Sequence, residues 1–168
     1  SEAQSYLELA QARGFWGAYD VALRSAADDA SVCSFTNLLF SILRFSECTG
    51  GRYPDHISLV TWCEKSARLD HHRESIKWPK ERYSFVGVGS FSDRPDAVRS
   101  EHETLRLYAD QRSGGGNILQ AKRARRNPNN IPWQFRYTHV APEVDMLLRH
   151  EGPDIISAPM PWELRVQS

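Results

Sequence analysis

Two pairs of polar residues have the types and the spacing of a site that binds an anion. Ser34 and Asn37 lie three residues apart at the start of one predicted helix, and Lys65 and Arg68 lie three apart at the start of another. Residues three apart share a helix face. A hydroxyl and an amide beside two cations suit a phosphate or carboxylate. The alternatives are a solvated helix start on which Glu64 pairs with the cations, and a structural amide at Asn37 buried within an apolar stripe.

Other residues with possible chemistry have weaker patterns. Cys63 follows a predicted strand but belongs to no Cys–His–Asn signature, so a buried inert thiol is the better interpretation. His71 and His72 are adjacent and point about 100° apart on a helix, which does not suit a shared zinc ion. The cations of 122–126 lack interleaved aromatic residues, which favours a solvated face or pairing with acidic residues of 101–110 over nucleic acid. We therefore expect no metal site and no nucleic-acid partner.

The elements that must position these residues alternate between helices and short strands. β-rich runs lie at 57–62 and 83–88, and flanking helices indicate that the first is a buried parallel strand. Ser1 and Ser34 are the predicted N-caps of their helices. Apolar spacing and breakers predict helices at 1–14, 34–50, 65–77, 97–111, 117–126 and 142–150. This order is typical of an α/β layer fold with a mostly parallel sheet, in which ligands bind at the carboxyl ends of the strands.

Length and composition indicate one folded domain. The chain has 168 residues with five Trp and seven Phe, and its tail from about 151 to 168 is rich in proline and predicted to be irregular. Lys+Arg and Asp+Glu each total 21, so a global basic field for nucleic acid or an anionic membrane is excluded. We see neither an apolar run of roughly 20 residues, the length of a membrane span, nor a signal peptide. Three Cys without CxxC spacing favour a reducing compartment, so we expect a cytoplasmic protein.

Several segments, taken together and in order, resemble the fungal branch of the YdcF/SanA/ElyC-like family, a group of domains of unknown function. The ordered set spans nearly the whole chain and is more specific than any one motif. It comprises Ser1-Glu2-Ala3, Ser34-x-x-Asn37-Leu38-Leu39-Phe40-Ser41-Ile42, Arg44-Phe45, Thr49-Gly50, Tyr53-Pro54, Lys65-x-x-Arg68, His72-Arg73, Trp78-Pro79, Lys122-Arg123-x-x-Arg126-Asn127-Pro128 and Pro159-Met160-Pro161-Trp162. The resemblance implies a single Rossmann-like domain over 1–168, with a three-layer α/β fold.

The resemblance also implies where a ligand would bind. In the family, the Ser-Glu-Ala element follows a first strand and a glycine-rich turn that help to form the pocket, so this chain resembles a member shortened at its N-terminus. Ser1 and Glu2 would then lie at the ligand, with Glu2 bonding a ribose hydroxyl or acting as general base. Cys33 stands where the fungal pattern usually has Asp. Bacterial relatives are associated with S-adenosylmethionine binding in one case and with cell-envelope functions in others.

Two functions follow from these patterns. The first is an α/β domain, either a binding domain or an enzyme of unknown reaction, for a small anionic or nucleotide-like ligand such as a nucleotide or S-adenosylmethionine. In it Ser34 and Asn37 would orient the ligand, while Lys65 and Arg68 would hold its anionic part. The alternative is a non-catalytic domain that acts through self-association or a protein partner, because a missing first strand would leave a sheet edge exposed.

Overall fold

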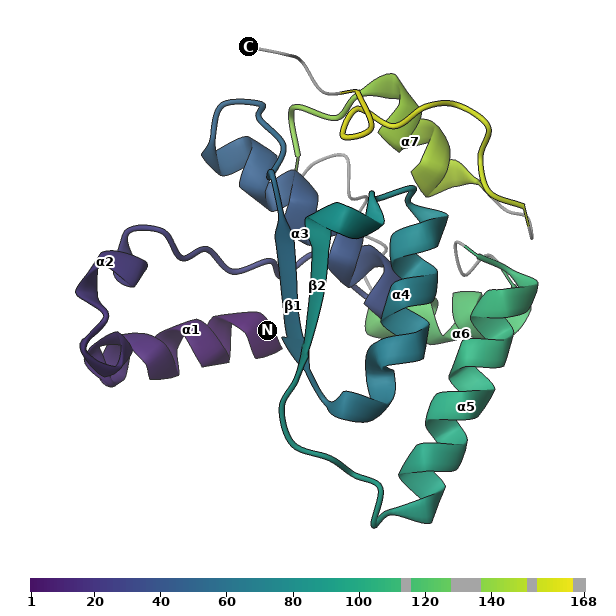
Figure 1. Cartoon of the computed structure of the whole chain (residues 1–168), viewed down its shortest axis with the longest axis horizontal. Helices are drawn as coiled ribbons and strands as arrows, with labels where there is room; N and C mark the ends of the chain where they lie inside the picture. The colour runs from purple at the N-terminus through teal and green to yellow at the C-terminus, as the bar shows by residue number, and fades with distance from the viewer. Residues whose placement is uncertain (113–115, 128–136, 151–153, 165–168) are drawn as a thin grey trace.

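The structure is built around two parallel strands joined by a helix. A computed structural model describes residues 1–112, 116–127, 137–150 and 154–164 of the chain (Figure 1). Leu59 of the first strand lies opposite Phe85 of the second in the register. The elements of this unit are β1 (Ile57–Thr61), η2 (Cys63–Lys65), α4 (Ser66–Ser75), η3 (Lys80–Arg82) and β2 (Tyr83–Gly87). Parallel neighbours need such a crossover connection. Because the two strands run in the same direction, their carboxyl ends lie at one edge of the sheet.

Helices before and after this unit complete the described part of the chain. They are α1 (Glu2–Ala12), η1 (Gly14–Gly17), α2 (Tyr19–Ala22), α3 (Ser34–Cys48), α5 (Pro95–Asp110), α6 (Asn117–Arg126) and α7 (Pro142–Arg149). In Figure 1, α3 passes behind the sheet, and α4 and α5 follow on the side of β2. The start of α1 lies beside β1, and α1 and α2 extend away from the sheet on the opposite side to α4. The predicted helices are confirmed, with small shifts at their ends.

Of the two predicted N-caps, the one at Ser1 is confirmed and the one at Ser34 is wrong. The hydroxyl of Ser1 accepts a hydrogen bond from the backbone N–H of Gln4 at 3.2 Å, as the capping pattern predicts. Ser34, however, does not cap α3. The N-cap is Cys33, whose backbone is extended (φ −155°) and whose N–H donates to Thr36 Oγ1 at 3.1 Å. Ser34 therefore lies in the first turn of the helix, where its hydroxyl is free to bond outside α3.

The sheet buries only one of its two faces. Leu59 and Phe85 point toward the helices and are partly buried, whereas Val60 and Val86 are 60% and 44% exposed. The prediction of a fully buried first strand is therefore wrong, since alternate residues of β1 face outward. The α/β fold with a parallel sheet is confirmed for the described residues, in which the sheet has two strands. The third layer of a Rossmann-like fold stays a prediction.

The hydrophobic core lies between α3, α4 and the C-terminal segments. Leu39 in α3 and Val144 in α7 are fully buried. The tail, predicted to be irregular, also belongs to the core: the Trp162 indole N–H donates to the Ile76 carbonyl at 2.9 Å, and its ring lies 5.7 Å from that of Trp78. Within the tail, 151–153 and 165–168 lie outside the described residues. Chain outside the helices thus also contributes buried side chains to the core, among them Met160 and Trp162.

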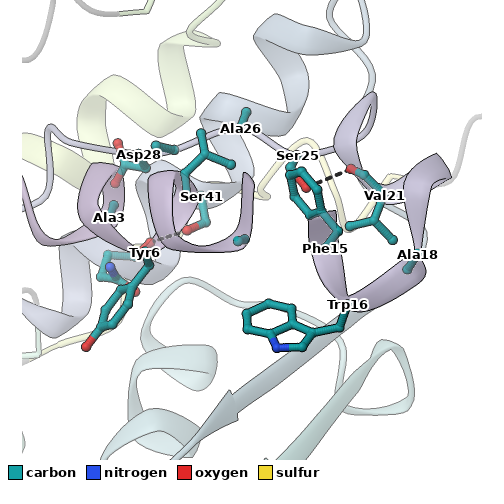
Figure 2. A pocket seen from close by; sticks show the side chains of 14 residues that line it. Ala3, Tyr6, Phe15, Trp16, Ala18, Val21, Ser25, Ala26, Asp28 and Ser41 are labelled. Carbon is teal, nitrogen blue, oxygen red and sulfur yellow. Dashed lines mark hydrogen bonds between the residues drawn. The ribbon is translucent and has the colours of Figure 1, made fainter. Parts of the chain in front are cut away.

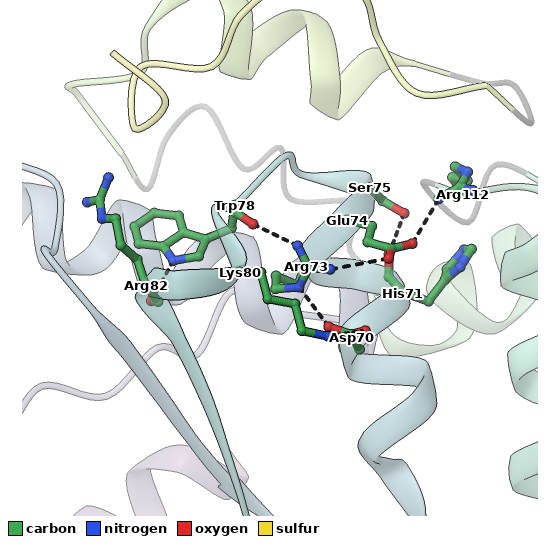
Figure 3. A network of polar contacts seen from close by, with 9 residues as sticks. All are labelled: Asp70, His71, Arg73, Glu74, Ser75, Trp78, Lys80, Arg82 and Arg112. Carbon is green, nitrogen blue, oxygen red and sulfur yellow. Dashed lines mark hydrogen bonds and ion pairs between the residues drawn. The ribbon is translucent and has the colours of Figure 1, made fainter. Parts of the chain in front are cut away.

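Arg73 fixes the turn that follows α4 (Figure 3). Its guanidinium is 9% exposed and donates to the Asp70 carboxylate at 2.7 Å and to the Trp78 carbonyl at 2.9 Å. The Arg73 guanidinium, through its hydrogen bond and charge, lowers the pKa of Asp70. On the far side of the Trp78 ring, the Arg82 guanidinium lies 5.0 Å from the ring centroid. Together these contacts hold the chain between α4 and β2.

We expect Arg73→Ala to lower the free energy of unfolding by about 3 kcal/mol, because it leaves a buried carbonyl and a carboxylate without their partner. Urea denaturation measures this change. The control is Arg149→Ala, which removes an exposed Arg149–Asp145 pair and should cost less than about 0.5 kcal/mol. Equal losses in the two variants would contradict the role of Arg73.

Candidate functional site

A hollow of about 600 Å³ lies at the carboxyl end of β1. We call it the strand-end hollow. It is bounded by the end of β1, the first turns of α3 and α4, and the start of α1. Five of the residues singled out in the sequence line it, namely Glu2, Ser34, Asn37, Lys65 and Arg68. The structure thus brings together side chains that are far apart in the sequence, and it does so at the edge where parallel sheets bind ligands.

Lys65 is a cation of this hollow whose charge no acidic residue of the described chain neutralises. It lies at the end of η2 and is half-buried, and its side chain has no hydrogen-bond or ion-pair partner among the described residues. Glu64 does not pair with it, so that alternative is wrong. Glu64 instead accepts hydrogen bonds from the hydroxyl of Ser90 and the backbone N–H of Phe91, and the Ser90 bond lowers the pKa of Glu64.

Arg68 also lines the hollow, but its charge is already neutralised. Its Nε and Nη2 atoms donate to the two carboxylate oxygens of Glu101 at 2.6 and 2.8 Å, and both side chains are 10% exposed. Such a two-pronged bond fixes the guanidinium in one orientation. Arg68 is therefore better placed to shape the wall between α4 and α5 than to hold the charge of a ligand.

The other predicted residues occupy the rim. Asn37 is exposed, so the interpretation as a buried structural amide is wrong; its amide N–H₂ lies 3.5 Å from the hydroxyl of Ser31. Glu2 is also exposed and accepts a hydrogen bond from the Tyr6 hydroxyl at 3.1 Å. Ser1 uses its hydroxyl as a cap and does not line the hollow. Glu2 and Asn37 can therefore meet the uncharged polar part of a ligand.

Sequence reasoning missed the partner of Ser34. The Ser34 hydroxyl lies 2.9 Å from Nε2 of His72, which is completely buried between the rings of Phe35 and Tyr108. Burial, followed by the charges of Arg68 and His71, lowers the pKa of His72 well below its usual range. The imidazole is therefore neutral. In the sequence, His72 stands out only as a neighbour of His71 that does not suit a shared metal and as part of the His72-Arg73 match to the family, and neither pattern indicates a bond to Ser34.

Cys33, noted in the sequence only as a departure from the family pattern, also lines the strand-end hollow. Its thiol accepts a hydrogen bond from Nε of Arg123 at 3.3 Å. Burial raises the pKa of this thiol, but the charge of Arg123 and the hydrogen bonds from Thr36 outweigh that effect and lower it overall. Cys63, by contrast, is exposed, so its interpretation as a buried thiol is wrong.

A second hollow of about 530 Å³ has a different character (Figure 2). It lies between α1, the η1–α2 turn and α3, and apolar side chains such as Tyr6, Phe15 and Trp16 dominate its walls. Phe15 and Trp16 adopt left-handed backbone conformations, with φ of 48° and 51°. The hollow has no cluster of titratable groups in its described walls, so it offers packing surface rather than chemistry.

Comparisons with known proteins identify no relative. No protein-family model, curated protein or solved structure matches the chain. Among the residues described, no three His, Cys, Asp or Glu side chains gather closely enough to hold a metal ion. Within the same residues no helix is both long and apolar enough to cross a membrane. The resemblance to the YdcF-like family stays a prediction.

The buried, neutral His72 makes stability depend on pH. Below the ordinary histidine pKa of about 6.5, the unfolded chain binds a proton that the folded protein does not, so the free energy of unfolding should fall by about 1.4 kcal/mol per pH unit on acidification. Urea denaturation between about pH 7 and about pH 5 measures this slope.

The matched control uses another histidine that also bonds a serine. His56 Nε2 lies 2.8 Å from the Ser84 hydroxyl but is exposed. We expect His72→Gln to flatten the pH slope and His56→Gln to leave it in place. A slope that is absent from the unmodified protein, or kept by His72→Gln, would refute the buried neutral imidazole.

Proposed function

We propose that the strand-end hollow binds a small ligand through an anionic group. The observation that carries this proposal is the side chain of Lys65, which lines the hollow and has no partner among the described residues. A half-buried ammonium is stabilised by a counter-charge. An anion bound beside Lys65 would therefore gain more free energy from the ammonium than it loses by leaving water.

The start of α3 supports the same position. Ser34 lies in the first turn of this 15-residue helix and lines the hollow with Lys65. Backbone N–H groups in a first turn have no acceptor within their helix, and the helix dipole favours negative charge there. The lysine and the helix start would therefore bind the same anionic group from two sides.

The rim supports recognition of the rest of the ligand. Glu2 and Asn37 offer a carboxylate and an amide at the mouth of the hollow, and such groups bond the hydroxyls of a sugar or ribose. Glu2 is also the candidate general base if the ligand is a substrate. This arrangement is the one expected of a Rossmann-like domain of the YdcF-like family, and we propose that assignment on the parallel crossover and the placement of the hollow.

Thermal unfolding tests the site. Adenosine diphosphate at millimolar concentration should raise the melting temperature by about 3 °C or more, because a ligand of the native state stabilises it. Lys65→Ala should clearly reduce the rise. Lys80→Ala, which removes an equal charge outside the hollow, should leave it unchanged. A melting temperature that does not respond, or a rise that is equal in the unmodified protein and in Lys65→Ala, would sink the proposal.

A second candidate function is self-association through the open face of the sheet. Val60 and Val86 lie opposite each other in the register, and with Val88 they are 60%, 44% and 52% exposed. Two copies of this exposed valine patch can pack against each other as the faces of a sandwich do. A second copy is the occupant we propose, because it presents the same apolar pair to its partner.

Sedimentation velocity separates this candidate from a monomeric binding domain. We expect dimers whose fraction rises with protein concentration. Val86→Lys should yield monomers, because it places a charge in the apolar contact. Met146→Lys alters a comparably exposed side chain on α7 (52%) and should leave the dimers intact. A protein that is monomeric at every concentration would rule out self-association.

A further inference from the structure

A third hollow lies beside the strand-end hollow, on the other side of the start of α3. Its volume is about 330 Å³, and its walls come from α3, α4, α5 and α6. We call it the basic hollow, because Lys122, Arg125 and Arg126 of α6 line it together with Arg68. The hydroxyl-bearing residues Ser100 and Thr104 of α5 face it from the opposite side.

The positive charges of this hollow are not balanced within it. No acidic residue is among its described lining. The expected pairing with acidic residues of 101–110 does not neutralise these charges. The Glu101 carboxylate is held by Arg68, and among the described residues no ion pair joins Lys122, Arg125 or Arg126 to an acidic residue of that segment. Lys122 and Arg125 have no partner among the described residues, and the Arg126 Nη1 donates only to the uncharged carbonyl of Val32, at 2.9 Å.

Like charges held together on one helix repel each other, and a multivalent anion relieves that repulsion. A single carboxylate would balance one of the three charges of α6. A terminal phosphate group carries nearly two negative charges at neutral pH and presents three acceptor oxygens. The basic hollow therefore suits a phosphate better than a carboxylate.

The two hollows adjoin. Cys33, Ser34, Arg68 and Arg126 line both of them. The start of α3 therefore borders both hollows: Lys65 lines the strand-end hollow, and Lys122 and Arg125 line the basic hollow. Arg126 lines both. A ligand with two linked anionic groups can place one in each hollow.

We propose that the adjoining hollows form one site for a nucleoside diphosphate. The first phosphate lies by Lys65 and the start of α3, the terminal phosphate lies in the basic hollow, and the ribose hydroxyls meet Glu2 and Asn37. This proposal rests on the proposed function and names its ligand class. It also disfavours S-adenosylmethionine, whose ammonium and sulfonium charges would be repelled by the cations of α6.

Calorimetric titration with adenosine mono- and diphosphate tests the proposal. The unmodified protein should bind the diphosphate at least about tenfold more tightly than the monophosphate, because only the diphosphate gains charge-assisted hydrogen bonds in the basic hollow. In the double variant that combines Lys122→Ala with Arg125→Ala, the affinity for the diphosphate should fall to the value for the monophosphate. The affinity for the monophosphate should not change. Lys65→Ala should weaken both. S-adenosylmethionine should release no binding heat.

The control is Lys80→Ala with Arg106→Ala, which removes two charges from side chains that line neither hollow. It should keep the preference for the diphosphate, and circular dichroism should show the same helix content in both double variants. Equal affinity for the two nucleotides, or a preference for the diphosphate that survives loss of Lys122 and Arg125, would overturn the proposal that the ligand is a nucleoside diphosphate. Failure of both nucleotides to bind overturns the proposed function as well.

Discussion

The hydrogen bond between Ser34 and His72 is the contact on which the candidate site depends. It joins the first turn of α3 to α4 at 2.9 Å, and one of its partners is fully buried. Because both hollows use the start of α3 as a wall, their shape is set by where this turn lies against α4. A neutral imidazole suits this position, since a charged one would face the nearby guanidinium of Arg68 within a dry core.

Much of the candidate site could be predicted from the sequence, because it follows from local pattern and one topological rule. The apolar stripe of α3 and the polar stretch that follows β1 indicate where α3 and α4 begin, and parallel strands place those beginnings at one edge of the sheet. That reasoning brings Ser34, Asn37, Lys65 and Arg68 to one hollow, as the structure does. It says nothing of the protonation, pairing or exposure of each side chain, so it left Asn37 open between a buried structural amide and a ligand contact, and the structure shows that Asn37 is exposed.

The features that could not be predicted all depend on contacts between distant segments. Glu101 lies 33 residues from Arg68, and no spacing rule connects them. The composition of 122–126 does not show whether its cations face solvent or a hollow. The packing of α6 beside α5 determines which of the two they face. The single-residue shift of the α3 cap from Ser34 to Cys33 has the same origin, because the hydroxyl of Ser34 bonds a histidine of another helix.

The place of Trp162 in the core has a consequence for synthesis of the chain. Its indole closes over Trp78 and bonds the carbonyl of Ile76, which is 86 residues earlier. A nascent polypeptide emerging from the ribosome has therefore completed α3, α4 and both strands long before this aromatic cover is translated. Until then the side of Trp78 that Trp162 covers stays open to solvent, so the last part of the core forms only when the end of this segment has been synthesised.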